Sequence, residues 1–174
     1  MRRVLCLLTL VMTVTLVHAQ RGQDFASKYI GLCKGDSSIQ CVTVSPKMVE
    51  QLLKSGDYDN NESIKEALTK LKSVRVITVT DNGKDYYERA ENLLKKNARR
   101  FHQDKAYQTG QQQRAFYTRK DKKGNPVELV MLYNNNEAEK TIIVNLTGTL
   151  DEGFIRSVAR HFEKKREFSK LSNK

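Results

Sequence analysis

The stretch that decides the fold class is RAFYTRKDKKGNPVELVMLYNNNEAEKTIIVNL, residues 114–146. It contains three runs rich in β-branched and aromatic residues: Arg114 to Lys120, Val127 to Tyr133 and Lys140 to Leu146. Two short polar turns, at 123–125 and 134–136, separate these runs. Links this short between β-rich runs predict antiparallel hairpins. With Lys105 to Thr109 as a further strand, the C-terminal half is predicted to be a β-meander.

Helices and two more strands are predicted around this meander. Strands are expected at 39–44, with Ile39, Cys41 and Thr43 on one face, and at 74–80. Capping residues and apolar spacing of three and four predict the helices. These are a short helix capped by Asp24, one from Ser45-Pro46 to about Ser55, one opened by Ser63 to Glu66, one ending near Arg100, and one opened by Thr149 to Glu152 that carries Ile155, Val158, Ala159 and Phe162.

The predicted order is β-α-α-β-α-β-β-β-β-α. This order indicates an α+β fold, with a single mostly antiparallel sheet and helices packed on one face. The expected division is a signal peptide at 1–19, a leader with a short helix at 20–38, one α+β domain at 39–162 and a basic tail at 163–174.

The N-terminus has the composition of an export signal. Arg2 and Arg3 precede an apolar run, Val4 to Val17, and Val17-His18-Ala19 ends in the small-residue pattern that signal peptidase cuts. The run is shorter than the roughly 20 residues of a membrane span and fits a secretory signal. We therefore expect an exported protein in the periplasm or outer envelope, soluble and without a transmembrane segment after cleavage.

Two cysteines remain after cleavage, and they flank a polar stretch that can turn back on itself. An oxidising compartment favours a disulfide between Cys33 and Cys41. The alternative is two thiols, with Cys41 buried in a strand. A zinc site is not expected, because no Cys or His pair lies at ligand spacing nearby.

The chain carries a formal net charge of +11, which falls by two when Arg2 and Arg3 are removed. Such a charge favours anionic surfaces, although basic residues at a helix C-terminus also stabilise the helix itself. The basic residues form three clusters: one ends the helix near Arg100, one runs through the C-terminal segment from Arg156, and one surrounds a turn and consists of Arg119, Lys120, Lys122 and Lys123. The residues that we expect to bind an anionic partner are Lys95, Lys96, Arg99, Arg100, Arg156, Arg160, Lys164 and Lys165.

Catalytic chemistry finds little support in the sequence. Only His102 and His161 remain after cleavage, and neither lies in a spaced metal motif or beside a nucleophile elbow. We therefore expect no catalytic residue, cofactor or metal. Nucleic-acid binding is also not expected, because the aromatic-glycine signature of base-stacking sheets is absent.

Four segments together resemble a family of small exported Bacteroidetes proteins, domain of unknown function 4252. The resemblance spans about Asp24 to Phe162 and implies a Gram-negative envelope protein with an α+β domain and no assigned catalytic residues. The four segments are Val42 to Met48, Lys70 to Ile77, Glu128 to Leu132 and Ile142 to Asp151.

Three functions follow from these observations, in order of preference. The first is a non-enzymatic interaction or adaptor module for an envelope protein or an anionic envelope component such as lipid, lipopolysaccharide or acidic glycan. The second is a carrier of a small ligand in an apolar cavity, and the third is an enzyme of unrecognised type. The pattern sets no oligomeric state.

Overall fold

The computed structural model describes residues 23–45, 48, 66 and 69–156, and the chain divides into two units, residues 1–34 and 35–174. The first unit contains α2 (Phe25–Leu32). Its N-cap is Asp24, as predicted, because the Asp24 side chain accepts a hydrogen bond of 2.7 Å from the backbone N–H of Ser27. The rings of Phe25 and Tyr29 stack along one side of the helix, with their centroids 5.7 Å apart.

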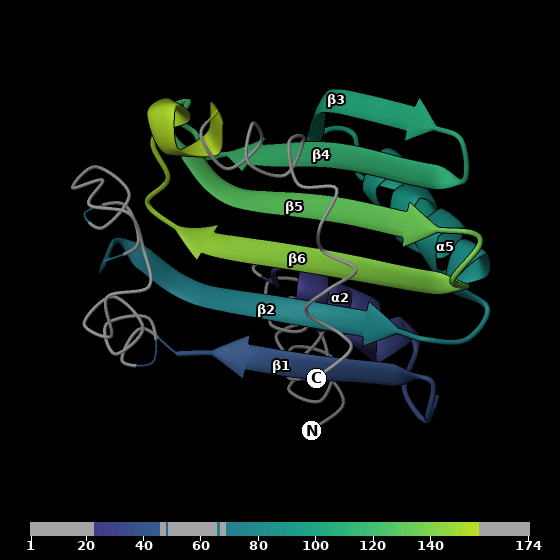
Figure 1. The fold of residues 1–174 in the computed structure, drawn as a ribbon. Coiled ribbons are helices and arrows are strands. Elements are labelled where there is room, and N and C mark those ends of the chain that lie inside the picture. Colours follow the sequence, from purple (N-terminus) through teal and green to yellow (C-terminus); the bar gives the residue numbers. More distant parts are fainter. Residues whose placement is uncertain (1–22, 46–47, 49–65, 67–68, 157–174) are drawn as a thin grey trace, which may run out of the picture. The chain divides into compact units, whose positions relative to one another are not determined.

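The second unit is built on one six-stranded antiparallel sheet, which confirms the predicted α+β class. The order across the sheet is β1-β2-β6-β5-β4-β3 (Figure 1). The strands are β1 (Ile39–Val44), β2 (Leu71–Val79), β3 (His102–Thr109), β4 (Gln112–Lys120), β5 (Pro126–Asn135) and β6 (Lys140–Gly148). Strands β3 to β6 form the predicted meander, and β2 pairs with β6, so that segments from the two halves of the chain meet in the middle of the sheet.

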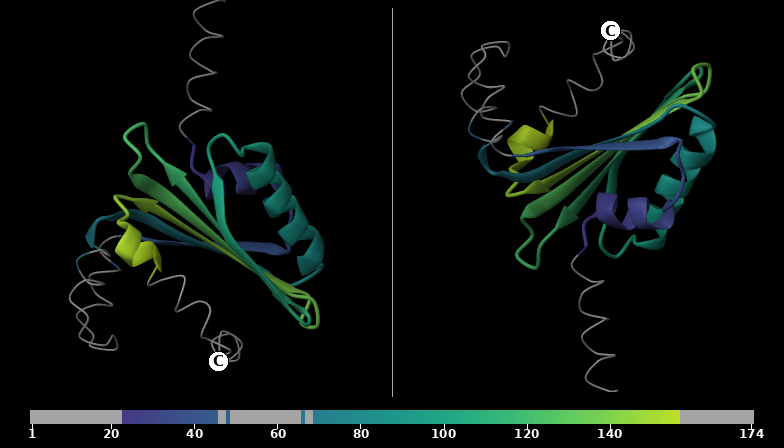
Figure 2. Two further views of the ribbon diagram at one scale, coloured as in Figure 1. Left: turned by 90° about the horizontal axis from the view of Figure 1, so that it is seen from above. Right: turned by 90° about the horizontal axis from the view of Figure 1, so that it is seen from below.

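One face of the sheet is covered by α5 (Gly83–Lys96), and we call it the α5 face. Figure 2 shows this helix lying along one side of the strands. Alternate strand residues point to it, because successive side chains of a strand leave opposite faces. The buried apolar side chains on this face are Ile77, Val79, Ala115, Tyr117, Val130, Leu132 and Ile143, and α5 contributes Tyr86, Tyr87, Ala90, Leu93 and Leu94.

The opposite side, which we call the second face, carries a separate core cluster of Leu71, Phe116, Leu129, Met131, Leu146, Leu150 and Phe154. Leu150 and Phe154 come from the segment after β6, where residues 152–156 are helical. The prediction placed the helices on one face, whereas this turn of helix lies on the other side of the sheet from α5 (Figure 2).

The element boundaries differ from the prediction in two instructive places. The helix predicted to end near Arg100 ends at Lys96 instead, because the Asn97 side chain donates a 2.7 Å hydrogen bond to the carbonyl of Leu93. The last helix is capped by Asp151 and not by Thr149, since the Asp151 Oδ1 accepts a 2.7 Å bond from the N–H of Phe154. In both cases the helix ends or begins at a polar side chain that bonds to a backbone carbonyl or N–H group left free at the helix end, two or more residues from the predicted boundary.

Other predictions fall outside the described residues. These are the signal peptide, the helix from Ser45 to about Ser55, most of the helix opened by Ser63, and the tail after Arg156. Within the described parts, no helix is long and apolar enough to cross a membrane.

Candidate binding cleft

A cleft of ≈350 Å³ lies on the second face, where β3, β4 and the start of β5 meet the helical turn at 152–156. Its apolar lining comes from Phe116 on β4, Pro126 on β5 and Ile155 on the turn. Its polar lining consists of three cations, Lys105, Lys120 and Arg156, together with Asp104, Glu152 and Thr118. The cleft therefore combines an apolar floor with a rim in which cations outnumber carboxylates.

An irregularity in β3 shapes one wall of the cleft. The register shifts between Gln103 and Lys105, so that Asp104 is an extra residue relative to β4. Lys105 lies opposite Phe116, and the Thr118 hydroxyl donates a hydrogen bond to the Asp104 carboxylate. A bulge of this kind redirects side chains at a sheet edge, and here it brings Asp104 and Lys105 together at the rim.

The other wall is fixed by backbone contacts to the strands. The N–H of Leu150 donates to the carbonyl of Pro126 at 3.1 Å, and the N–H of Thr149 donates to the carbonyl of Lys70 at 3.2 Å. The helical turn that follows carries Glu152, whose carboxylate lies 3.7 Å from Lys120 Nζ and 3.7 Å from Arg156 Nη1. These two ion pairs are exposed to solvent, so they place the cations at the rim without adding much stability.

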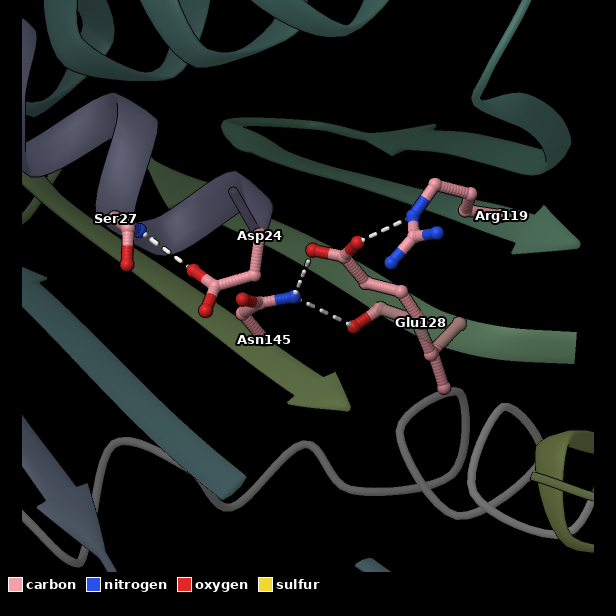
Figure 3. A network of polar contacts seen from close by, with 6 residues as sticks. Asp24, Ser27, Arg119, Glu128 and Asn145 are labelled. Atoms are coloured by element: carbon pink, nitrogen blue, oxygen red, sulfur yellow. Dashed lines mark hydrogen bonds and ion pairs between the residues drawn. The ribbon is translucent and has the colours of Figure 1, made fainter. Parts of the chain in front are cut away.

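A buried polar network lies on the α5 face behind this end of β4 and β5 (Figure 3). The Glu128 side chain is fully buried, and its carboxylate accepts a 2.7 Å hydrogen bond from Arg119 Nε and a 3.0 Å bond from Asn145 Nδ2. Asn145 Nδ2 also lies 3.4 Å from the carbonyl of Leu129. The network joins β4, β5 and β6 in one register, and Arg119 is the immediate neighbour of the cleft residues Thr118 and Lys120. It therefore holds the strand ends that carry the cleft.

The predicted anion-binding residues are divided by the sheet. Lys95 and Lys96 end α5, and Arg99 and Arg100 follow it, on the side of the α5 face. Lys95 Nζ lies 2.8 Å from Glu91, and the Arg100 guanidinium lies 5.9 Å from the centroid of the Phe101 ring. Arg156 lies on the second face, and Arg160, Lys164 and Lys165 are outside the described residues.

The cleft brings together residues that the sequence separates. Lys120 belongs to the basic cluster around the turn at 123–125. Because successive side chains of β4 point to opposite faces of the sheet, Arg119 enters the buried network and Lys120 lines the cleft. Lys105 was missed, because the bulge at Asp104 interrupts the alternation that would have shown its face. The His102 side chain is exposed at the start of β3.

The two cysteines and the candidate metal ligands give no further site. Cys41 is exposed on β1 rather than buried, and the structure forms no disulfide between Cys33 and Cys41, so that bond stays a prediction. Among the described residues, no group of three or more His, Cys, Asp or Glu side chains is arranged to hold a metal ion.

The comparisons with curated proteins and with solved structures gave no match. The model of the family described as Domain of unknown function (DUF4252) matches residues 33–158, a range that takes in every strand of the sheet and all residues of the cleft. The chain therefore belongs to the DUF4252 family.

Proposed function

We propose that the protein is an exported binding module without catalytic activity, and that its cleft on the second face binds an anionic component of the cell envelope that also has an apolar part. The observation that carries this proposal is the arrangement of Lys105, Lys120 and Arg156 around Phe116, Pro126 and Ile155. Cations at a rim attract a negative headgroup, and an apolar floor accepts the adjoining hydrocarbon. An export signal at residues 1–19, as expected from the sequence, would bring the protein to the envelope.

The test compares two charge reversals of equal size on opposite faces of the sheet. Lys105→Glu with Lys120→Glu changes the cleft, and Lys95→Glu with Lys96→Glu changes the end of α5 by the same net charge. The chain from Gln20 to Lys174 is mixed with phosphatidylglycerol–phosphatidylcholine vesicles at low and high salt. Vesicles of phosphatidylcholine alone serve as the uncharged control, and bound protein is measured by sedimentation.

The cleft pair should weaken binding by at least roughly 30-fold, since each of the two lost cations contributes about 1 kcal/mol near an anionic surface and the two added carboxylates are repelled by it. The α5 pair should bind nearly as the unchanged chain does. An equal loss in both pairs would show that net charge alone drives binding, and a loss confined to the α5 pair would move the site to the cluster predicted from the sequence. Both results would refute the assignment of the cleft.

A small-ligand carrier is the second candidate, and the size of the cleft favours it. A volume of ≈350 Å³ lies within the range of about 300–1,000 Å³ found for small-molecule sites. Native mass spectrometry of the protein purified from its own cell envelope would show a retained mass in the unchanged chain. That mass should be lost in a Phe116→Asp variant that is still folded by circular dichroism.

A further inference from the structure

An apolar row crosses the second face from one edge of the sheet almost to the other. Directly opposed cross-strand pairs form it: Val42 with Val76, Val76 with Val144, Val144 with Met131, and Met131 with Phe116. Met131 and Phe116, both members of the core cluster, are 4% and 2% exposed, whereas Val42 is 57% exposed on β1. The row is therefore covered at the β4 end and uncovered where it reaches the edge strand.

The two edge strands of the sheet differ in how they are protected. Strand β3 carries Asp104, Lys105 and a bulge, features that discourage pairing with another chain. Strand β1, with the sequence IQCVTV, has no charged residue and no proline, and its register with β2 runs without a shift from Ile39 to Val44. No strand lies beyond β1 among the described residues (Figure 1). Only β1 is thus suited to accept another strand.

We propose that β1 pairs antiparallel with β1 of a second copy of this chain, about a two-fold axis at Val42. Opposed residues in a continuous sheet must share a face. Even-numbered residues of one β1 strand can therefore lie only opposite even-numbered residues of the other, and odd-numbered opposite odd-numbered. Centring it on Val42 places the two Val42 side chains opposite each other and Cys41 opposite Thr43 of the second copy. The apolar row then continues without a break from one copy into the other.

Two properties of β1 favour a second copy as the occupant. The strand is uncharged, so the two copies meet without opposed like charges in the paired segment, and its pattern is self-complementary about Val42. A six-residue edge is short, and interfaces below about 1,200 Å² are typical of weak association. The dimer is therefore expected at high protein concentration, with exchange between monomer and dimer.

Sedimentation equilibrium over a concentration series tests the association. The chain from Gln20 to Lys174 should show a monomer–dimer equilibrium. Val42→Lys should raise the dissociation constant at least tenfold, because it sets two like charges directly opposite each other. Tyr107→Lys is the matched control, since Tyr107 is the exposed apolar residue of the other edge strand, and it should leave the equilibrium unchanged.

A covalent readout tests the register. In a Cys33→Ser, Cys41→Ser background, Val42→Cys should form an intermolecular disulfide rapidly under oxidising conditions, because the two Cα atoms would lie within the 4.4–6.8 Å that a disulfide requires. Tyr107→Cys in the same background should not. A monomer at every concentration, equal effects of Val42→Lys and Tyr107→Lys, or equal cross-linking at positions 42 and 107 would each overturn the proposal.

Discussion

Replacing Arg119 with Met should destabilise the protein more than any change on its surface, because Arg119 neutralises a fully buried carboxylate. The Glu128 side chain is 0% exposed, whereas that of Arg119 is 24% exposed. Breaking a buried ion pair by removing one partner costs about 3–5 kcal/mol, since the remaining charge is left uncompensated. Asn145 still donates its 3.0 Å bond in this variant, so we expect the lower end of that range, about 3 kcal/mol.

The reverse change, Glu128→Met, should cost less. The Arg119 guanidinium that it leaves behind already reaches solvent, so we expect a loss of about 1–2 kcal/mol. The double variant should be more stable than Arg119→Met alone, because no buried charge is left without its partner.

Urea unfolding followed by circular dichroism, at neutral pH, gives the free energy of unfolding of all four proteins, and the double-mutant cycle isolates the coupling between the two side chains. We expect a coupling of about 2 kcal/mol. Additive losses, or a loss below about 1 kcal/mol for Arg119→Met, would refute the reasoning that this pair is a desolvated ion pair that holds β4 to β5.

Three further predictions concern single positions. Gly83→Ala should destabilise the protein by about 2 kcal/mol or more in urea unfolding, because a Cβ atom there would lie 2.5 Å from the backbone oxygen of Glu139; unchanged stability would contradict the observed contact between α5 and the β5–β6 turn. Tyr117→Phe should raise stability by up to about 1 kcal/mol, since no hydrogen bond of normal geometry within the described residues satisfies the buried Tyr117 hydroxyl, although the Glu91 side chain lies near enough to affect its pKa. A loss of stability in this variant would show that the hydroxyl bonds to the Glu91 carboxylate instead. Burial, with the Glu91 carboxylate nearby, raises the pKa of Tyr117 to about 12 from 10.0. As the pH rises, the unfolded chain therefore loses this proton before the folded protein does, and the unchanged protein should lose stability between about pH 10 and 12. The Phe variant should show no such loss. Hydrogen bonds from the Tyr86 hydroxyl and the Ser38 backbone lower the pKa of Asp36. Tyr86→Phe should therefore reduce the free energy of unfolding at neutral pH. The difference in free energy between this variant and the unchanged protein should vanish as the pH falls through the folded-state pKa of Asp36.

Most of the secondary structure in the described parts of the chain could be predicted because its signals are local. The turn at 123–125 contains residues that favour tight turns, and the runs around the two predicted turns formed β4, β5 and β6 to within two residues of the predicted ends. The second turn lies at 136–139 rather than 134–136, because Asn134 and Asn135 pair within the sheet as the end of β5. The Asp24 cap was predicted on the same basis, since a capping side chain needs only the backbone three residues ahead.

The candidate site could not be predicted in this way, because it depends on contacts between distant segments. The cleft needs the bulge at Asp104, which follows from pairing with β4 and has no sequence signal of its own. It also needs Arg156 beside Lys120, which depends on the Asp151-capped turn being bonded to the start of β5. Charge density along the sequence therefore grouped Arg156 with the α5 cluster, although the sheet lies between them.

The cleft and the β1 edge lie on one face but should act independently, and this separation can be tested. Phe116 lines the cleft and ends the apolar row that Val42 begins, and four strand spacings of about 4.8 Å put the two ends roughly 19 Å apart. Sites separated by more than about 10 Å, without shared partners, usually contribute additively. Lys105→Glu with Lys120→Glu should therefore weaken vesicle binding and leave the dimerisation constant unchanged, and Val42→Lys should do the opposite. If either variant changed both measurements, the second face would be one continuous interface, and a single large partner would then explain it better than an anionic ligand and a second copy.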